Sequence, residues 1–509
     1  MDYLLKNQYV CAGAEILDTV TQQAVDLDFT LPDYCADIEK ILKCTLVPKI
    51  YTRTFSAGQL RVDGASVLSI LYCDSNKKAL RCCEQTVPFS ATIPVSEDAA
   101  ENAVITTAKP EYLNCRALTP RRLTVHGAFS LYTAIHTKRI YDIKKECSNE
   151  ALQIKTKNAD VFELCELNQE QFNVAQTVNL RPKNAVESIV RSDVTALVTD
   201  FQQSSDKLLL KGEVTLRMLY ICDAATGEVD QFIYVFPFSQ SIDSKDSDCT
   251  VTDVRLDVLT YELLLRTGVL TEEPSISIDL KMCASVSGYK QSNITFITDA
   301  YSVAEHTRLS VDSLTLSSEV YPLKANCAVK SSLQLGERQI SKIMDIFWEE
   351  PAVAVDLKDG KAELTGKVKL CILATVEDGE LVCIERQADI KHSETLSKVF
   401  SVCKHIRASV TSVSYRMAEE NTIDVRLDMQ VSALLSNSIT FEQVVSVEGT
   451  GETDTGSYSH PLTLYYAHKG EQVWEIAKRY STLLSSLCEE NSIEEEELTE
   501  ARMLMIVNA

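Results

Sequence analysis

The chain has 509 residues, of which 45% are hydrophobic and 24% are charged, and its formal net charge is −23. This length is too great for one hydrophobic core and predicts several domains. The negative charge argues against a nucleic-acid partner and against charge-driven binding to an anionic membrane, since both surfaces attract cations. No run approaches 18 apolar residues, so we expect no membrane insertion.

The N-terminal residues, MDYLLKNQYVCAGAEILD, lack the basic start and sustained apolar run of a secretory signal. The seventeen cysteines are odd in number, scattered, and nowhere in a Cys-x-x-Cys arrangement. This usage is typical of a reducing compartment, where cysteines act as small buried apolar residues. We therefore expect the protein to act inside the cell that makes it. Cys82 and Cys83 should face opposite sides of one strand.

Three similar segments follow one another in the first 445 residues. Each has an alternating strand with one glycine, and these glycines, 148 and 154 residues apart, are Gly64, Gly212 and Gly366. The first two segments also share a Pro-Phe-Ser sequence, at Pro88 to Ser90 and at Pro237 to Ser239. We interpret the glycines as structural, at a bulge or a close backbone approach, rather than as ligand contacts.

A leucine precedes each glycine by 31 to 33 residues, at Leu31, Leu180 and Leu335. After it comes a polar turn and then apolar residues three apart, which predict a short helix. These pairs are Ile38/Ile41, Val186/Ile189 and Ile340/Ile343. Each copy ends with another alternating strand, such as TIDVRLDMQVSALL. The unit is therefore expected to be mainly β, a sandwich or open barrel with one short helix.

The period predicts repeats at residues 1–145, 146–298 and 299–447. Residues 448–459, EGTGETDTGSYS, are rich in Gly, Ser and Thr and lack apolar periodicity. This composition predicts a flexible linker, so the remaining residues, 460–509, should form a module that tumbles separately.

The terminal module shows an apolar strand from Leu462, a helix around Trp474, a second short helix around Leu487, and a strand from Met503. This βααβ order in fifty residues resembles the LysM module, a compact carbohydrate- or protein-binding unit. The candidate partner-binding residues are Gly470, Glu471, Gln472, Trp474, Leu487, Asn491 and Arg502.

The module is acidic, with four Lys or Arg against nine Glu, which gives 4 − 9 = −5. A capping box from Ser492 to Glu495 would explain part of the run Glu494 to Glu497, and an acidic binding face is the alternative. For Trp474, a place in the module core and a role in partner contact both stay open.

No catalytic signature emerges from the rest of the chain. The phosphate-binding loop Gly-x-x-x-x-Gly-Lys-Ser/Thr, the His-Glu-x-x-His pair and the Gly-x-Ser-x-Gly elbow are all missing from the sequence. The seven histidines never lie four residues apart. We therefore predict a scaffold that is not an enzyme and has no catalytic, cofactor-binding or metal-binding residues.

The segment LPDYCADIEKIL, with Pro32, Asp33, Tyr34 and Asp37, resembles the SPOCS domain of endospore-forming Firmicutes. Tandem SPOCS-like units followed by one LysM module resemble the SipL-type spore coat morphogenetic proteins of clostridia. The resemblance implies a non-enzymatic adaptor in the mother-cell cytoplasm, at the forespore surface. Its LysM module would bind the coat basement-layer ATPase, stage IV sporulation protein A, and other coat proteins would be further partners.

The alternative is a cell-envelope protein that binds peptidoglycan through N-acetylglucosamine. Sugar-binding LysM modules usually have Gly-Asp-Thr before the first helix and Pro-Gly-Gln before the last strand. Here these positions hold Gly470-Glu471-Gln472 and Glu500-Ala501-Arg502. The changes alter the floor and backbone path of a sugar groove, so they favour a protein partner.

Overall fold

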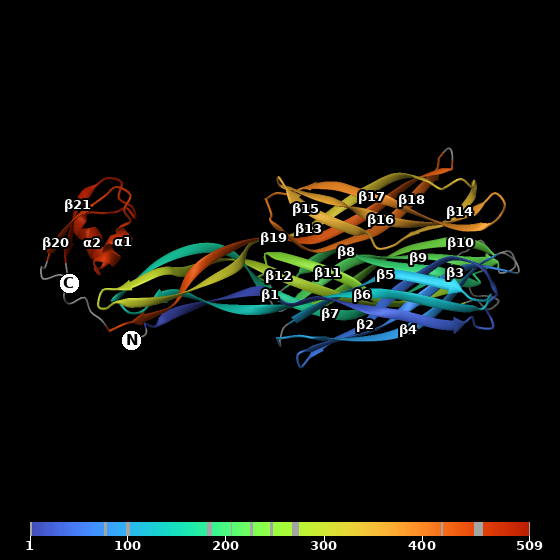
Figure 1. The fold of residues 1–509 in the computed structure, drawn as a ribbon, viewed down its shortest axis with the longest axis horizontal. Coiled ribbons are helices and arrows are strands. Elements are labelled where there is room, and N and C mark those ends of the chain that lie inside the picture. The colour runs from blue at the N-terminus through green and yellow to red at the C-terminus, as the bar shows by residue number, and fades with distance from the viewer. Residues whose placement is uncertain are drawn as a thin grey trace.

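The computed structural model describes residues 3–75, 79–97, 102–180, 186–204, 206–223, 227–244, 248–266, 274–418, 421–451 and 462–507. Three β units come first in the chain, and a small module of two strands and two helices ends it (Figure 1). The predicted mainly β class is confirmed. The described helices are too short to span a membrane.

The first unit consists of two antiparallel sheets that pack face to face. One sheet has the strand order β2-β3-β4 and the other has the order β1-β6-β5. Leu46 and Leu60 from the first sheet share a core with Phe129 and Leu131 from the second. The strands are β1 (Leu5–Thr30), β2 (Ile38–Ser56), β3 (Gln59–Asp74), β4 (Leu80–Pro94), β5 (Asn102–Ala117) and β6 (Arg122–Cys147).

The second and third units repeat this order. The sheets are β10-β9-β8 with β11-β12-β7, and then β14, β15, β16 and β17 with β13-β19-β18. In the second unit the strands are β7 (Leu152–Asn179), β8 (Ser188–Gln203), β9 (Lys207–Asp223), β10 (Glu228–Asp243), β11 (Val251–Arg266) and β12 (Ser275–Ser302). The third has β13 (Thr307–Gln334), β14 (Ile340–Trp348), β15 (Ala352–Lys358), β16 (Lys361–Val376), β17 (Leu381–Thr395), β18 (Val402–Met417) and β19 (Thr422–Gly449). One strand topology therefore occurs three times.

The short helices predicted at Ile38/Ile41, Val186/Ile189 and Ile340/Ile343 are wrong. The structure has the starts of β2, β8 and β14 there, with Val186 just before its strand. In β2 the pairing with β3 skips one residue after Ile38 and another after Ile41, and β14 skips likewise after Ile340 and Ile343. A bulge adds one residue to the two-residue period of a strand. Apolar residues three apart therefore keep facing one core, as they would on a helix.

The glycines of the repeat lie where strands approach closely, as predicted. A Cβ atom on Gly64 would lie 2.2 Å from the Lys49 carbonyl oxygen, and one on Gly212 would lie 2.4 Å from that of Leu197. The corresponding distance at Gly366 is 2.0 Å, to the Ala352 oxygen. The shared Pro-Phe-Ser sequence has its reason here too, since the Phe89 and Phe238 rings lie against Gly64 and Gly212.

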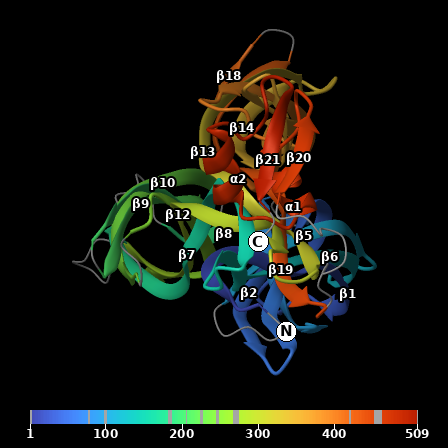
Figure 2. The ribbon, with the colours of Figure 1, turned by 90° about the vertical axis from the view of Figure 1, so that its left-hand side faces the viewer.

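The three units surround a common axis, and the view along that axis shows three lobes (Figure 2). One apolar cluster joins all three, with Leu71 and Leu80 from the first, Leu219 from the second, and Phe347 and Leu373 from the third. Cys82 belongs to this cluster and Cys83 to the core of the first unit, so they face opposite sides of β4 as predicted. The units are thus packed together through side chains that a lone unit would expose.

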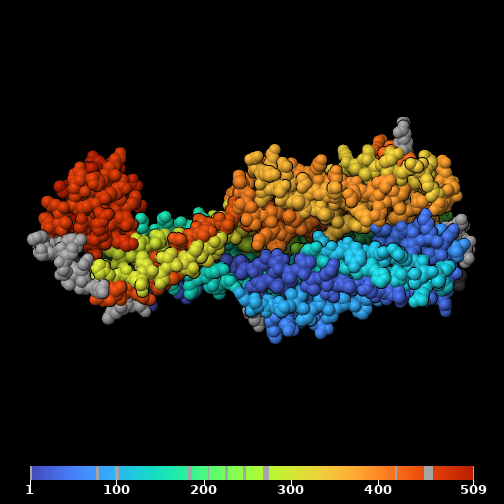
Figure 3. Space-filling model, viewed as in Figure 1, coloured from blue at the N-terminus to red at the C-terminus, as the bar shows by residue number. Residues whose placement is uncertain are grey.

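At one end the longest strands leave the sandwiches and form a narrower stalk (Figure 3). The stalk contains three two-stranded ribbons, β1 with β6, β7 with β12, and β13 with β19. Each ribbon has a bulge at an equivalent place, Ile16, Cys165 or Ser318. Bulges increase the twist of a ribbon, which lets the three wind together. Val161, Phe296 and Phe441 are among the residues that form their shared core.

The terminal module has the predicted strand and helix order. It consists of β20 (Leu462–Ala467), α1 (Val473–Arg479), α2 (Leu484–Asn491) and β21 (Arg502–Val507). The predicted linker starts too early, because Glu448 and Gly449 still belong to β19 and pair with β13. Its residues 452–459 lie outside the described part of the chain.

Candidate functional site

The loops that precede α1 and β21 are bound to each other. The Gly470 N–H donates to the Leu498 oxygen at 2.8 Å, and the Leu498 N–H donates to the Glu471 oxygen at 3.0 Å. The Gln472 side-chain amide donates to Glu497 Oε2 at 2.9 Å. Gly470 has a φ of +91°, which favours glycine at this turn. The backbone and side-chain groups of the predicted residues 470–472 therefore form hydrogen bonds within the module, which join its two loops.

Asn491, Arg502 and Leu487 hold α2 against the last strand. The Asn491 side chain donates to the Met505 oxygen at 2.7 Å and accepts from the Met505 N–H at 2.6 Å. Arg502 Nη2 donates to the Asn491 backbone oxygen at 2.5 Å. Leu487 is only 2% exposed and packs in the module core. The structure thus brings these three predicted residues together, in contacts within the module.

Trp474 faces the tip of the stalk and is 6% exposed. Its indole Nε1 donates to Asp299 Oδ2 at 2.8 Å, and the Tyr301 ring lies edge-on at a centroid distance of 5.0 Å. Lys478 Nζ donates to both Asp299 oxygens at 2.7 Å, and the Tyr301 hydroxyl donates to the Thr482 oxygen at 2.8 Å. The prediction that the module tumbles separately is therefore wrong, because a buried tyrosine and a shared carboxylate hold it on the stalk.

The outward face of the two-stranded sheet β20–β21 carries six apolar side chains. They form three cross-strand pairs, Leu462 with Val507, Leu464 with Met505, and Tyr466 with Met503. Their exposed fractions run from 37% for Met505 to 64% for Leu464. We call these six residues the apolar face. Such a patch on so small a module is typical of a protein interaction site.

The apolar face was missed from the sequence, although a signal for it exists. A strand with one face in water alternates apolar and polar residues, whereas LTLYY and MLMIV place apolar residues on both faces. Leu504 and Ile506 on the inner face of β21 are buried in the module core. The described elements of the module include no second layer for the outer face to pack against.

The module also exposes a run of acidic residues, but without the predicted capping box. Ser492 ends α2 in the left-handed region with a φ of +51°, and the Ile493 N–H donates to the Cys488 oxygen at 2.9 Å. This is a Schellman-type helix end, which turns the chain away and buries Ile493. The run Glu494 to Glu497 follows without a helix and is exposed to solvent.

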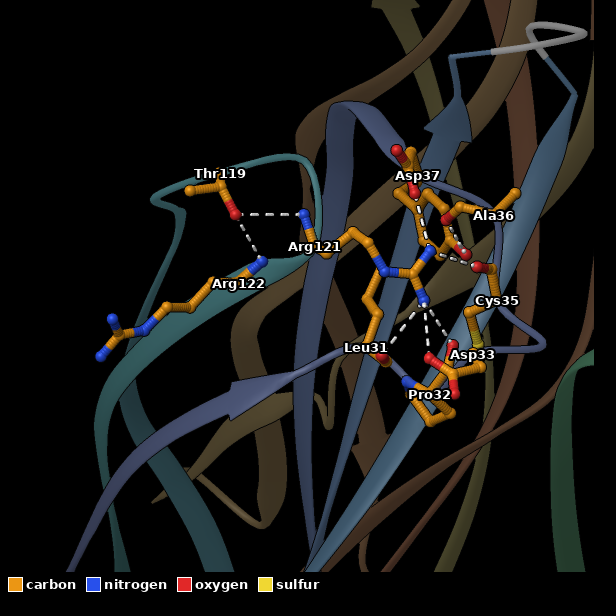
Figure 4. Close-up of polar contacts among 10 residues, drawn as sticks. Leu31, Pro32, Asp33, Cys35, Ala36, Asp37, Thr119, Arg121 and Arg122 are labelled. Atoms are coloured by element: carbon orange, nitrogen blue, oxygen red, sulfur yellow. Dashed lines mark hydrogen bonds and ion pairs between the residues drawn. The ribbon is translucent and has the colours of Figure 1, made fainter.

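The segment LPDYCADI forms a loop between β1 and β2 that Arg121 holds in place (Figure 4). The guanidinium donates to the Pro32 oxygen at 2.9 Å, to the Cys35 oxygen at 3.1 Å, and to Asp37 Oδ1 at 2.7 Å. The Tyr34 side chain remains 89% exposed. Most of this sequence signature is therefore explained by the shape of the loop, and Tyr34 is the large side chain that it presents to solvent.

The third unit uses Asn421 where the first uses Arg121, just before its last strand. The Asn421 amide donates to the Gly336 and Arg338 oxygens at 2.9 and 2.7 Å. In all three units the recurring leucine donates its backbone N–H to the carbonyl oxygen of the residue before that strand, Leu31 to Arg121, Leu180 to Pro274, and Leu335 to Asn421. Equivalent loops are thus closed by different side chains around one backbone bond, which explains why only the leucine recurs in the sequence.

Glu349, Cys371 and Glu385 form one cluster with metal-ligand spacing among the described residues, with ligand atoms within 4.8 Å of one another. Two lysines already neutralise it. Lys43 Nζ contacts Glu349 at 3.1 Å and also binds Glu385, while Lys369 Nζ lies 2.7 Å from Glu385. Because Lys43 comes from the first unit, the cluster acts as an ionic contact between units.

Residues 37–118 and 185–264 match the family described as SipL, SPOCS domain. The first and second units therefore each contain a sequence that matches the SPOCS domain. The two SPOCS matches run from the start of β2 to the end of β5 and cover the equivalent strands β8 to β11. No curated protein and no solved structure matches the chain. The SPOCS match indicates a SipL-like sporulation protein.

Proposed function

We propose that this SPOCS protein is a non-enzymatic adaptor of spore coat and cortex formation. It acts in the mother-cell cytoplasm at the forespore surface. Its terminal LysM-like module docks on the coat basement-layer ATPase, stage IV sporulation protein A, while the three units form a rigid spacer that other coat proteins contact. The SPOCS match supports the sporulation role. The apolar face of the module is the observation that supports docking.

The apolar face is suited to a protein partner for two reasons. It is continuous across three cross-strand pairs, so it offers the apolar centre that protein interfaces need. It also lies on the side of the sheet away from the module core, and the stalk contact at Trp474 leaves it exposed. The module can thus stay on the stalk and bind a partner at once.

The charge of the module favours a basic partner over a second copy of this chain. Two copies would bring together modules that each carry exposed glutamates, at 489, 490, 494 to 497 and 500. Like charges at an interface oppose association, whereas lysines and arginines around an apolar centre would be attracted. We therefore infer a partner surface that is apolar where it meets this face and carries basic residues.

The test is capture of stage IV sporulation protein A by the full-length chain. The double substitution Leu464→Glu and Met505→Glu should weaken binding roughly tenfold or more, because charges at the interface centre remove its apolar contacts. The matched control is the double substitution Ile233→Glu and Val235→Glu, which changes two exposed apolar residues of β10. Unchanged capture by the Leu464/Met505 variant would contradict docking through this face.

The glycan alternative predicts a different result in sedimentation with purified peptidoglycan. The loops at residues 470–472 and 496–498 hydrogen-bond to each other, which favours a closed groove and hence no sedimentation. Sedimentation that is lost when Gln472 and Glu497 are replaced would favour glycan binding. A fluorescent fusion should outline the forespore during sporulation, and an envelope pattern in vegetative cells would argue against the adaptor.

A further inference from the structure

A cavity of about 410 Å³ lies where the three units meet. It is lined by residues of all three units, including Arg53 on β2, Arg255 on β11 and Arg407 on β18. A smaller cavity of about 60 Å³ shares Arg255 and Arg407 with it. The larger volume is within the range of small-molecule sites and far exceeds the space of one water molecule.

Cations outnumber carboxylates in the lining of this cavity. Its lining has four cations, Arg53, Lys109, Arg255 and Arg407, and three carboxylates, Asp18, Asp257 and Glu350, which gives 4 − 3 = +1. The whole chain carries −23, so the sign is reversed here. Lys109 and Glu350 form a pair at 3.5 Å. Asp257 is shared by Arg407 at 2.8 Å and Arg255 at 3.5 Å, while Asp253, which lines the smaller cavity, interacts with Arg255 and Lys324.

Arg53 has hydrogen bonds but no direct ion pair among the described residues. Its Nη1 and Nη2 donate to the backbone oxygens of Val104 and Thr106 at 3.3 and 3.0 Å. Its Nε is buried and has no hydrogen-bond partner there. Burial lowers the pKa of Arg53; the nearby carboxylate of Asp257 opposes this shift, whereas Arg255 adds to it. A buried guanidinium without a direct ion pair is costly, and an anion bound beside it would reduce that cost.

Of two neighbouring histidines, His405 lines the larger cavity and His136 packs against His405. The His136 and His405 rings lie edge to face with centroids 4.7 Å apart, and His136 Nε2 is buried with no hydrogen-bond partner in the described structure. Burial lowers the pKa of His405 to about 4, and His136, Arg255 and Lys404 contribute. Neutral imidazoles can donate a hydrogen bond to an anion without adding charge.

We propose that this cavity binds a small oxyanion, phosphate or a polycarboxylate, between Arg53, Arg255 and Arg407. Planar guanidiniums match the paired oxygens of both ligand classes. Since each arginine belongs to a different unit, the bound anion joins the three units and stabilises their junction. Binding to the folded chain alone also raises its stability by mass action.

The test is isothermal titration of the full-length chain with phosphate and, separately, with citrate, each against chloride at equal ionic strength. One saturable site per chain is expected for at least one oxyanion. The separate titrations with phosphate and citrate distinguish a phosphate site from a polycarboxylate site. Replacing Arg53→Gln should weaken binding roughly tenfold or more, since a charge-assisted hydrogen bond is lost. Arg61→Gln, on the exposed surface of β3, is the matched control and should bind normally.

Hydrogen exchange on the wild-type chain keeps the test decisive if the Arg53 variant does not fold. The oxyanion should slow amide exchange in β2, β11 and β18 together, whereas chloride should not. The proposal is overturned if neither oxyanion gives saturable binding, if exchange is unchanged, or if a folded Arg53→Gln variant binds as tightly as the wild type.

Discussion

At Gly64, Gly212 and Gly366 the missing side chain matters because a neighbouring carbonyl oxygen occupies the space of a Cβ atom. For the first two, this oxygen belongs to a residue next to a bulge, between Ile50 and Thr52 in β2 or between Val198 and Asp200 in β8. Backbone cannot move aside as a flexible side chain does. The repeat therefore keeps glycine where the sheet bends.

Gly64→Ala is expected to lower the free energy of unfolding by about 2–3 kcal/mol, because the added methyl group overlaps the Lys49 oxygen. Urea denaturation followed by circular dichroism would measure the change. Gly13→Ala is the control, since its Cβ would have its nearest neighbour at 3.4 Å, and its effect should stay within about 0.5 kcal/mol. Equal stabilities of the two variants would refute the close-approach explanation.

At the scale of elements, residues three apart are ambiguous between a helix and a bulged strand. The starts of β2 and β14 are bulged strands, because they pair with β3 and β16. The module shows the same dependence on partners. Its helices were predictable from local pattern, but its contact with Asp299 and Tyr301 depends on where β12 ends.

Asp299→Ala should release the module from the stalk, because Trp474 and Lys478 lose the carboxylate that they share. Loss of hydrogen bonds to a charged group weakens docking by about 2–3 kcal/mol. The readout is a red shift of Trp474 emission in a Trp348→Phe background, since these are the two tryptophans of the chain. Asp312→Ala, an exposed stalk residue, should leave the emission unchanged. Partner capture should persist in both variants, and its loss in the first would place the binding site at Trp474.

At the scale of the whole molecule, three copies of one topology share one axis and one central cluster. The first unit contributes Leu71 and Leu80, the second Leu219, and the third Phe347. The Arg191 guanidinium of the second unit also lies over the Phe347 ring, 4.5 Å from its centroid. The three units should therefore unfold cooperatively, in one transition, rather than independently of one another.

Phe347→Ala is expected to cost about 3–5 kcal/mol and to destabilise the first unit as well as the third. Hydrogen exchange in β2 and β3 would report this effect at a distance. Phe400→Ala, a buried residue that packs within the third unit, is the control and should speed exchange mainly there. If both variants leave exchange in β2 and β3 unchanged, the units are energetically independent.

The sequence by itself determined the mainly β class, the threefold repeat, the structural glycines and the βααβ module, because these depend on local periodicity and on side-chain size. Only the tertiary structure decided that Ile38 and Ile41 lie on a bulged strand, that Trp474 rests on the stalk, and that Arg53, Arg255 and Arg407 surround one cavity. These features arise from pairing and packing between residues far apart in the chain. The apolar face depended on both. The sequences LTLYY and MLMIV indicate its apolar residues, but their exposure depends on what the fold leaves uncovered.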